Sequence, residues 1–189
     1  MEIRARVAIA VIALAAAVVT AAAQPPHGAK GGDSAQPYAG QQARNVSSLS
    51  DEEVRGFLDG RGMGLARAAE LNGHPGPMHV LELDKELELT ADQRQRVQAA
   101  FDRMKAKAME LGAAYVKAER SVDQAFKSGS ADGAAVAALV AEANRLLAEV
   151  RLAHLNAHIE ITPLLTPEQR ARYAELRGYG GAAHGRHKH

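Results

Sequence analysis

The feature that most constrains this chain is a five-residue phrase that occurs twice, at 89–93 and at 165–169. Each copy has the composition of a helix start, because its threonine hydroxyl can accept a hydrogen bond from an unpaired backbone N–H of the first turn. The glutamine three residues later can reach back to the N–H of that threonine and complete a capping box. The phrase therefore predicts two helix starts. The residues that the copies share are Leu89, Thr90, Gln93, Leu165, Thr166 and Gln169.

The residues after Thr90 predict a long helix from Ala91 to about Lys127. Its apolar residues recur in alternating steps of four and three, a heptad pattern typical of paired helices. A short loop at 128–133 precedes a second long apolar pattern, from about Ala134 to Ile161. Because the loop is short, we expect the two helices to be antiparallel neighbours. The heptad residues of the first helix are Val97, Phe101, Met104, Ala108, Leu111, Tyr115, Ala118, Val122 and Ala125.

Shorter helices are predicted to flank this hairpin. A capping box at 50–53 opens one that runs to about Leu71, and the glycines at 60, 62 and 64 indicate a kink in it. Others are expected over about 78–88 and from Thr166 to about Arg177. We therefore expect an all-α fold, an elongated antiparallel hairpin of two long helices with shorter flanking helices. Two helices cannot bury such wide apolar stripes, so a second subunit is expected to cover the rest.

The chain begins with a segment of different character. Residues 1–23 are typical of a secretory signal peptide, because Arg4 and Arg6 precede an apolar run that ends in three alanines. An uncleaved membrane anchor is the alternative. Residues 24–49 are rich in Pro, Gly, Gln and Ser, and we expect a flexible leader there.

Residues 50–179 are expected to form the helical domain, followed by a disordered His-rich tail over 180–189. The chain has no cysteine, which excludes disulfides and thiolate ligands. Its net charge of +1 makes no case for nucleic acid as a partner. The sequence has no convincing nucleophile–base pair and no phosphate-binding loop, so we do not expect an enzyme.

With its two Leu-Thr-x-x-Gln phrases in an all-helical exported chain, the sequence resembles the LTxxQ-motif proteins of the bacterial cell envelope over roughly residues 50–179. This group includes the Spy and CpxP stress proteins and related periplasmic heavy-metal sensor and resistance proteins. The resemblance implies a periplasmic location and an antiparallel homodimer. It implies an ATP-independent chaperone of the envelope stress response, modulated by metal, or alternatively a heavy-metal-binding sensor or resistance protein.

Two histidines could carry metal chemistry. His154 and His158 are four residues apart and therefore project from one face of the second long helix. Neutral imidazoles at this spacing can hold one divalent transition metal such as Zn, Cu or Ni. The expected additional ligands are His79 and Glu82, one turn apart on a short helix. The alternative is that His154 is a core histidine bonded to a carboxylate and that His158 lies on the surface.

The first half of the helix after Thr90 is basic, with Asp102 as the opposing charge. Spy-like chaperones hold partly unfolded proteins on surfaces that combine such charges with apolar side chains, so the resemblance implies a client-binding surface on this stretch. The alternative is an ordinary solvated helix face. Expected partners are non-native envelope proteins or the periplasmic domain of a sensor kinase, without nucleic acid and without membrane insertion once the signal is cleaved. The candidate client-binding residues are Arg94, Arg96, Phe101, Arg103, Met104, Lys105 and Lys107.

Overall fold

The computed structural model describes residues 36–180. The expected signal peptide, residues 24–35 of the leader and the histidines of the tail lie outside the described residues. The chain divides into a unit of residues 1–37 and a unit that begins at Tyr38, and the second is described below. Its helices are α1 (Asp51–Leu58), α2 (Arg67–Glu70), α3 (Pro77–Glu82), α4 (Ala91–Lys127), α5 (Gly133–Ile161) and α6 (Pro167–Leu176), with a 3-10 turn over Thr162–Leu164. Residues 36–180 contain no strand, which confirms the all-α prediction.

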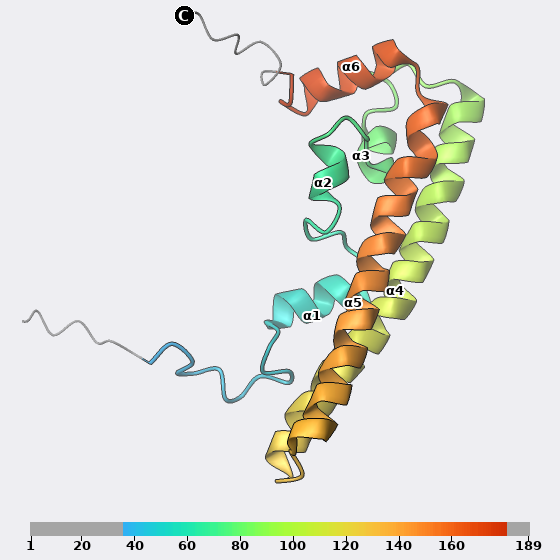
Figure 1. The fold of residues 1–189 in the computed structure, drawn as a ribbon. Coiled ribbons are helices and arrows are strands. Elements are labelled where there is room, and N and C mark those ends of the chain that lie inside the picture. Colours follow the sequence, from blue (N-terminus) through green and yellow to red (C-terminus); the bar gives the residue numbers. More distant parts are fainter. Residues whose placement is uncertain (1–35, 181–189) are drawn as a thin grey trace, which may run out of the picture. The chain divides into compact units, whose positions relative to one another are not determined.

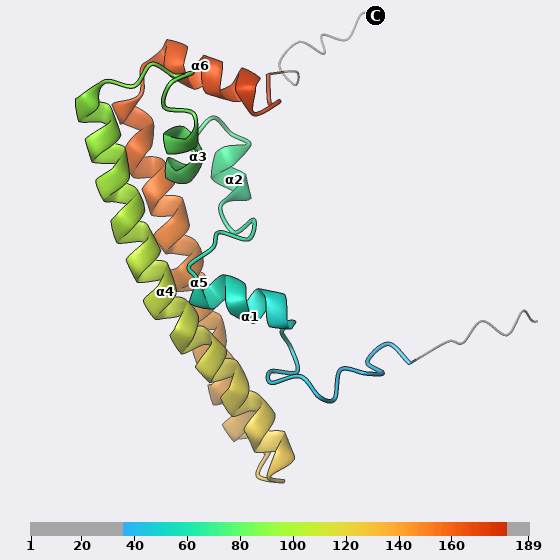
Figure 2. The same cartoon turned by 180° about the vertical axis from the view of Figure 1, so that it is seen from behind.

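The two long helices form the predicted hairpin and run side by side in both views (Figure 1, Figure 2). The 37 residues of α4 correspond to a length of about 55 Å at the rise of an ideal helix. Asp132 starts the return helix, because its Oδ1 accepts hydrogen bonds of 2.9 Å from the N–H groups of Ala134 and Ala135. None of the helices within residues 36–180 is both long enough and apolar enough to cross a bilayer.

Both repeated phrases form complete capping boxes. The hydroxyl of Thr90 accepts the N–H of Gln93 at 3.1 Å, and Gln93 Oε1 accepts the N–H of Thr90 at 3.0 Å. Thr166 and Gln169 make the same pair of bonds, at 3.2 and 2.9 Å. The structure therefore contains the two helix starts that the sequence predicts, at the first residues of α4 and α6.

The two glutamines also bind each other, which the sequence analysis did not anticipate. Gln93 Nε2 donates to Gln169 Oε1 at 2.8 Å, and Gln169 Nε2 donates to Gln93 Oε1 at 3.1 Å. The same nitrogens donate to the carbonyls of Leu164 and Leu87, respectively, at 2.8 and 3.1 Å. We call this reciprocal pair of Gln93 and Gln169 the glutamine clasp. It joins the start of α4 to the start of α6.

Apolar side chains pack around the clasp. Leu89 and Leu165, the first residues of the two phrases, are both buried there. The cluster that contains them consists of Val80, Leu87, Leu89, Val97, Ala100, Ile161, Leu165 and Tyr173. A half-buried hydrogen-bonded pair beside such a cluster is costly to disrupt, because water replaces its lost partners only in part.

A second cluster lies further along the hairpin, where α1 packs on α4. It consists of Val46, Leu49, Phe57, Leu111, Tyr115, Val116, Ala143, Leu146 and Val150. Two of these residues come from the segment that the sequence assigns to the leader. There Val46 is buried, and the N–H of Ser47 donates to Asp123 at 2.7 Å. Gly112 permits the close approach of α1, because a β-carbon at this position would lie 2.2 Å from the carbonyl oxygen of Phe57.

The prediction of one helix from Ser50 to about Leu71 is wrong. The chain leaves the helix after Leu58 and resumes it only at α2. In between, Gly60, Met63 and Gly64 have φ angles of 64°, 41° and 80°, a left-handed conformation that no α-helix tolerates. The short helix expected over 78–88 likewise ends at Glu82, and turns lead from there to the Thr90 cap.

The clasp predicts a specific pattern of stabilities. Replacing Gln93 or Gln169 with alanine removes several hydrogen bonds and leaves half-buried groups of the other amide and of the backbone unpaired, and we expect each change to lower the free energy of unfolding by about 1–3 kcal/mol. The double variant should lose less than the sum of the two single losses, by at least about 0.5 kcal/mol, because the pair is coupled. Urea denaturation of the four proteins measures this.

Gln98→Ala is the matched control, because Gln98 is an exposed α4 glutamine whose amide bonds only to Asp102, one turn away. We expect this change to stay within about 0.5 kcal/mol of the wild type. Strictly additive losses in the double variant would contradict a mutual interaction between Gln93 and Gln169.

Candidate metal-binding pocket

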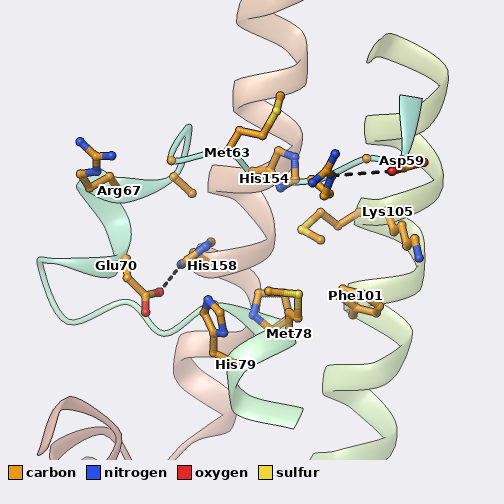
Figure 3. A pocket seen from close by; sticks show the side chains of 18 of the residues that line it. Asp59, Met63, Arg67, Glu70, Met78, His79, Phe101, Lys105, His154 and His158 are labelled. Atoms are coloured by element: carbon orange, nitrogen blue, oxygen red, sulfur yellow. Dashed lines mark ion pairs between the residues drawn. The ribbon is translucent and has the colours of Figure 1, made fainter. Parts of the chain in front are cut away.

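A pocket of about 920 Å³ lies between the long helices and the segment that contains α1 to α3. Both predicted histidines of α5 line it, together with Phe101, Met104 and Lys105 of α4. The rest of the lining comes from residues 59–71 and 76–79 and from Ser50, Glu52, Glu53 and Tyr179. Figure 3 shows labelled side chains from these elements around the pocket. The break after α1 therefore has a structural role, because it leads the chain past the histidine-bearing face of α5.

His154 is a buried imidazole without a hydrogen-bond partner on Nε2. The residue is only 3% exposed, and no group within hydrogen-bond distance satisfies that nitrogen. Burial, together with the neighbouring His158, lowers the pKa of His154. The ring is therefore held in its neutral form. The alternative interpretation, a core histidine bonded to a carboxylate, therefore does not hold at Nε2. A neutral imidazole nitrogen whose lone pair is unused can ligate a metal.

His158 is also buried, at 8% exposure, so it is not a surface residue. Its Nδ1 lies 2.7 Å from the carbonyl oxygen of His74, which can only accept a hydrogen bond. Nδ1 therefore carries the proton, and the lone pair of the neutral ring is on Nε2. Metal-ligating histidines are usually oriented by such a bond from the other ring nitrogen to a carbonyl or carboxylate.

Gly76 permits the close approach of this ring to the backbone. A β-carbon at Gly76 would lie 3.2 Å from His158 Nε2 and 3.3 Å from Glu70 Oε2. Such a β-carbon would also lie 2.9 Å from His158 Cε1, so even alanine would displace this ring. Glycine at this position therefore lets the ring and the carboxylate lie close to the backbone that precedes α3.

Glu70 of α2 is the site residue that sequence analysis missed. Its Oε1 accepts a hydrogen bond from the hydroxyl of Tyr173 at 2.5 Å, and Arg177 Nε lies 3.6 Å from the same oxygen. Its Oε2 lies 3.7 Å from His158 Nδ1 and is buried without a hydrogen-bond partner (Figure 3). Burial and the bond to Glu70 raise the pKa of Tyr173, so that its hydroxyl stays protonated. The only sequence signal for Glu70 was its position one turn before His74.

The expected ligands His79 and Glu82 are arranged differently. His79 lines the pocket, but its Nδ1 lies 2.9 Å from Glu82 Oε2, and Glu82 is an exposed residue that is not part of the lining. Within residues 36–180, no three His, Asp or Glu side chains are close enough together to hold one ion. The structure thus brings three histidines and Glu70 to one pocket without gathering His154, His158, His79 and Glu82 at a single point.

The predicted client-binding residues divide into two groups. Phe101, Met104 and Lys105 line the pocket, and Lys105 Nζ lies 6.0 Å from the centre of the Phe101 ring. The remaining four cations lie outside the pocket and pair with carboxylates. Their ion pairs are Arg94–Asp84 at 3.0 Å, Arg96–Asp92 at 3.6 Å, Arg103–Glu160 at 2.5 Å and Lys107–Glu110 at 3.1 Å.

The expectation that Asp102 is the opposing charge of this basic stretch is therefore wrong. Asp102 accepts a hydrogen bond from Gln98, while carboxylates of other turns and of α5 pair with the cations. Because these charges are balanced in pairs, the stretch is not a continuous positive surface.

A family model described as heavy-metal resistance matches residues 61–172, more than half of the chain. The matched region contains both repeated phrases, the pocket histidines and Glu70. No curated protein and no solved structure matches this chain.

The lowered pKa of His154 predicts a pH-dependent stability. As the pH falls through about 6.5, the ordinary value for histidine, the unfolded chain takes up a proton that the folded protein resists. The melting temperature should therefore decrease between pH 8 and pH 5.5, and less so for His154→Gln than for the wild type. Thermal unfolding in metal-free buffer measures this. If the melting temperatures of the two proteins change with pH in parallel, this would contradict the interpretation that His154 is neutral in the folded protein and that its protonation destabilises the fold.

Proposed function

Because the chain belongs to the heavy-metal resistance family of Spy/CpxP-like LTxxQ proteins, we propose that it binds transition-metal ions in the periplasm through the pocket described above. The observation that carries this proposal is that two potential ligand atoms, His154 Nε2 and Glu70 Oε2, are buried and have no hydrogen-bond partner within the protein. Leaving such atoms unpaired costs about 1–3 kcal/mol each, and an ion that binds them offsets this cost.

His154, His158 and Glu70 are the residues that would hold the ion. The bonds from His158 to the carbonyl of His74 and from Tyr173 to Glu70 orient two of these side chains before any ion arrives. The bound metal would act as cargo or as a signal, and the proposal includes no catalytic step. Since ligands must be deprotonated to bind, the lowered pKa of His154 keeps this ring available at mildly acidic pH.

The test is metal binding to the purified protein at equilibrium with Zn, Ni or Cu. We expect His154→Ala/His158→Ala to lose one bound equivalent, and Glu70→Gln to weaken binding. Glu82→Gln is the matched control, because Glu82 lies outside the pocket lining, and its binding should be unchanged. All these proteins carry alanine at His184, His187 and His189, so that the tail cannot bind metal. An unchanged stoichiometry in the His154/His158 double variant would reject the pocket as the site.

A second candidate function, the ATP-independent chaperone, is supported by the apolar character of the same pocket. Phe101, Met104 and exposed Met78 present apolar surface beside Lys105, and such a combination can hold non-native proteins loosely. Non-native envelope proteins or a sensor-kinase periplasmic domain would be the partners. A homodimer stays part of this proposal, because Leu152 and Ile159 of α5 are exposed.

The chaperone proposal predicts that the protein suppresses light scattering by a reduced, aggregating client at near-stoichiometric ratios. Phe101→Ala should weaken this suppression several-fold, because it removes the largest apolar contact of the pocket wall. Phe126→Ala is the control, since Phe126 is an exposed phenylalanine of α4 that does not line the pocket. Suppression that is absent, or that is equally affected by both changes, would count against this use of the pocket.

A further inference from the structure

The carboxylate of Glu70 is neutralised by a cation from a distant part of the chain. Arg177, the residue that caps the C-terminus of α6, has its Nε 3.6 Å from Glu70 Oε1. The same oxygen accepts the hydroxyl of Tyr173 at 2.5 Å. Among the described residues, the cations within ion-pair distance of Glu70 are Arg177 and, when protonated, His158. A buried carboxylate needs such a partner, because an isolated charge is costly to remove from water.

The ion pair between Glu70 and Arg177 is loose. Its separation of 3.6 Å is too long for a hydrogen bond, and the Nε of Arg177 is buried without a hydrogen-bond partner. Charge therefore holds this pair, without the parallel hydrogen bonds that strengthen a bidentate pair of arginine and carboxylate. A second cation beside Glu70 would compete with Arg177 for the same negative charge.

The other oxygen of Glu70 faces a proposed ligand. Oε2 has no hydrogen-bond partner and lies 3.7 Å from His158 Nδ1 (Figure 3). Oε2 and His158 Nε2 lie 3.3 and 3.2 Å from one point, the position that a β-carbon of Gly76 would take. One carboxylate would therefore serve both Arg177 and an ion held by these two donors.

Other carboxylates that line the pocket lie in a different environment. They are Glu52, Glu53 and Asp59, and all three are exposed. Water already compensates the charge of an exposed carboxylate, so a cation gains little from pairing with it. Competition between cations is therefore strongest at Glu70, where one oxygen is buried and unpaired.

The end of α6 offers the guanidinium group of Arg177 a second partner. Its Cζ lies 5.9 Å from the centre of the Tyr179 ring, within the range of a cation–π contact. Gly178 has a φ angle of 76°, and the N–H of Tyr179 donates to the carbonyl of Ala174 at 2.7 Å, so a tight turn holds this ring against the helix end. Arg177 can therefore move from the carboxylate toward the ring without unwinding α6.

We propose that Arg177 is the counter-cation of Glu70 in the ion-free protein and that binding of a divalent cation displaces it toward Tyr179. This inference rests on the proposed metal-binding function and adds a residue that sets the affinity of the site. Arg177 would oppose binding, although it contacts a ligand residue. The end of α6 would thereby report whether the pocket is occupied.

The first test is the affinity for Zn(II) of the full chain with the alanine-substituted tail described above. We expect Arg177→Gln to bind Zn(II) about three- to tenfold more tightly than this parent protein, because a competing charge is removed. Arg177→Lys keeps the charge and should stay close to the parent. Arg172→Gln is the matched control, since Arg172 lies on the same helix but pairs with Glu175 at 3.3 Å, and its affinity should be unchanged.

The second test needs no change at Arg177, so it does not depend on the folding of a variant. In the parent protein with ¹⁵N-labelled arginine, we expect saturation with Zn(II) to shift the Nε–H signal of Arg177 and to speed its exchange with water, because this buried group leaves the carboxylate. The Nε–H signal of Arg172 should stay in place.

Weaker Zn(II) binding by Arg177→Gln that Arg177→Lys restores would mean that Arg177 only positions Glu70, and it would overturn the proposal. An Arg177 signal that does not respond, combined with Zn(II) binding that depends on His154 and His158, would reject the displacement and leave the metal-binding function standing. If Zn(II) binding does not depend on these histidines, both proposals fail.

Discussion

The structure depends on the reciprocal bonds between Gln93 and Gln169. Each amide closes its own helix cap, binds the other amide and satisfies a carbonyl of the neighbouring segment. Because the two caps begin α4 and α6, and α6 follows α5, these bonds place the end of α5 beside the start of α4. They also fix the direction of α6, and with it the position of Tyr173, 103 residues away from its partner Glu70.

The same arrangement orients the side chains that line the pocket. Tyr173 on α6 holds one oxygen of Glu70, and the carbonyl of His74 holds one nitrogen of His158. His154 Nε2 and Glu70 Oε2 are buried without a hydrogen-bond partner, although the supporting bonds are in place. A chain selected for stability alone would pair or remove such atoms, since most buried polar groups in proteins have partners. This contrast is the physical reason for assigning a ligand to the pocket.

Local signals predicted the long helices well. The bounds of α4 follow from the Thr90 cap and the heptad repeat, and α5 begins within a residue of its predicted start. Predictions from the sequence were less successful where the conformation or role of a residue depends on residues that are distant in the sequence. The left-handed Met63 and the cation partner Glu160 depend on tertiary contacts, and so does Glu70 as a ligand. The burial of Val46 likewise had no periodic pattern to reveal it. The residues of the histidine pair were predictable because both lie on one continuous helix.

Gly76 shows what the open pocket requires of the chain. One added methyl group there would reach the ring of His158 and the carboxylate of Glu70 at once. A β-carbon would lie 2.9 Å from His158 Cε1, closer than such contacts normally allow, so even alanine would have to displace the ring. A change at this one backbone position would therefore disturb two of the proposed ligands together, although it lies on neither of their helices.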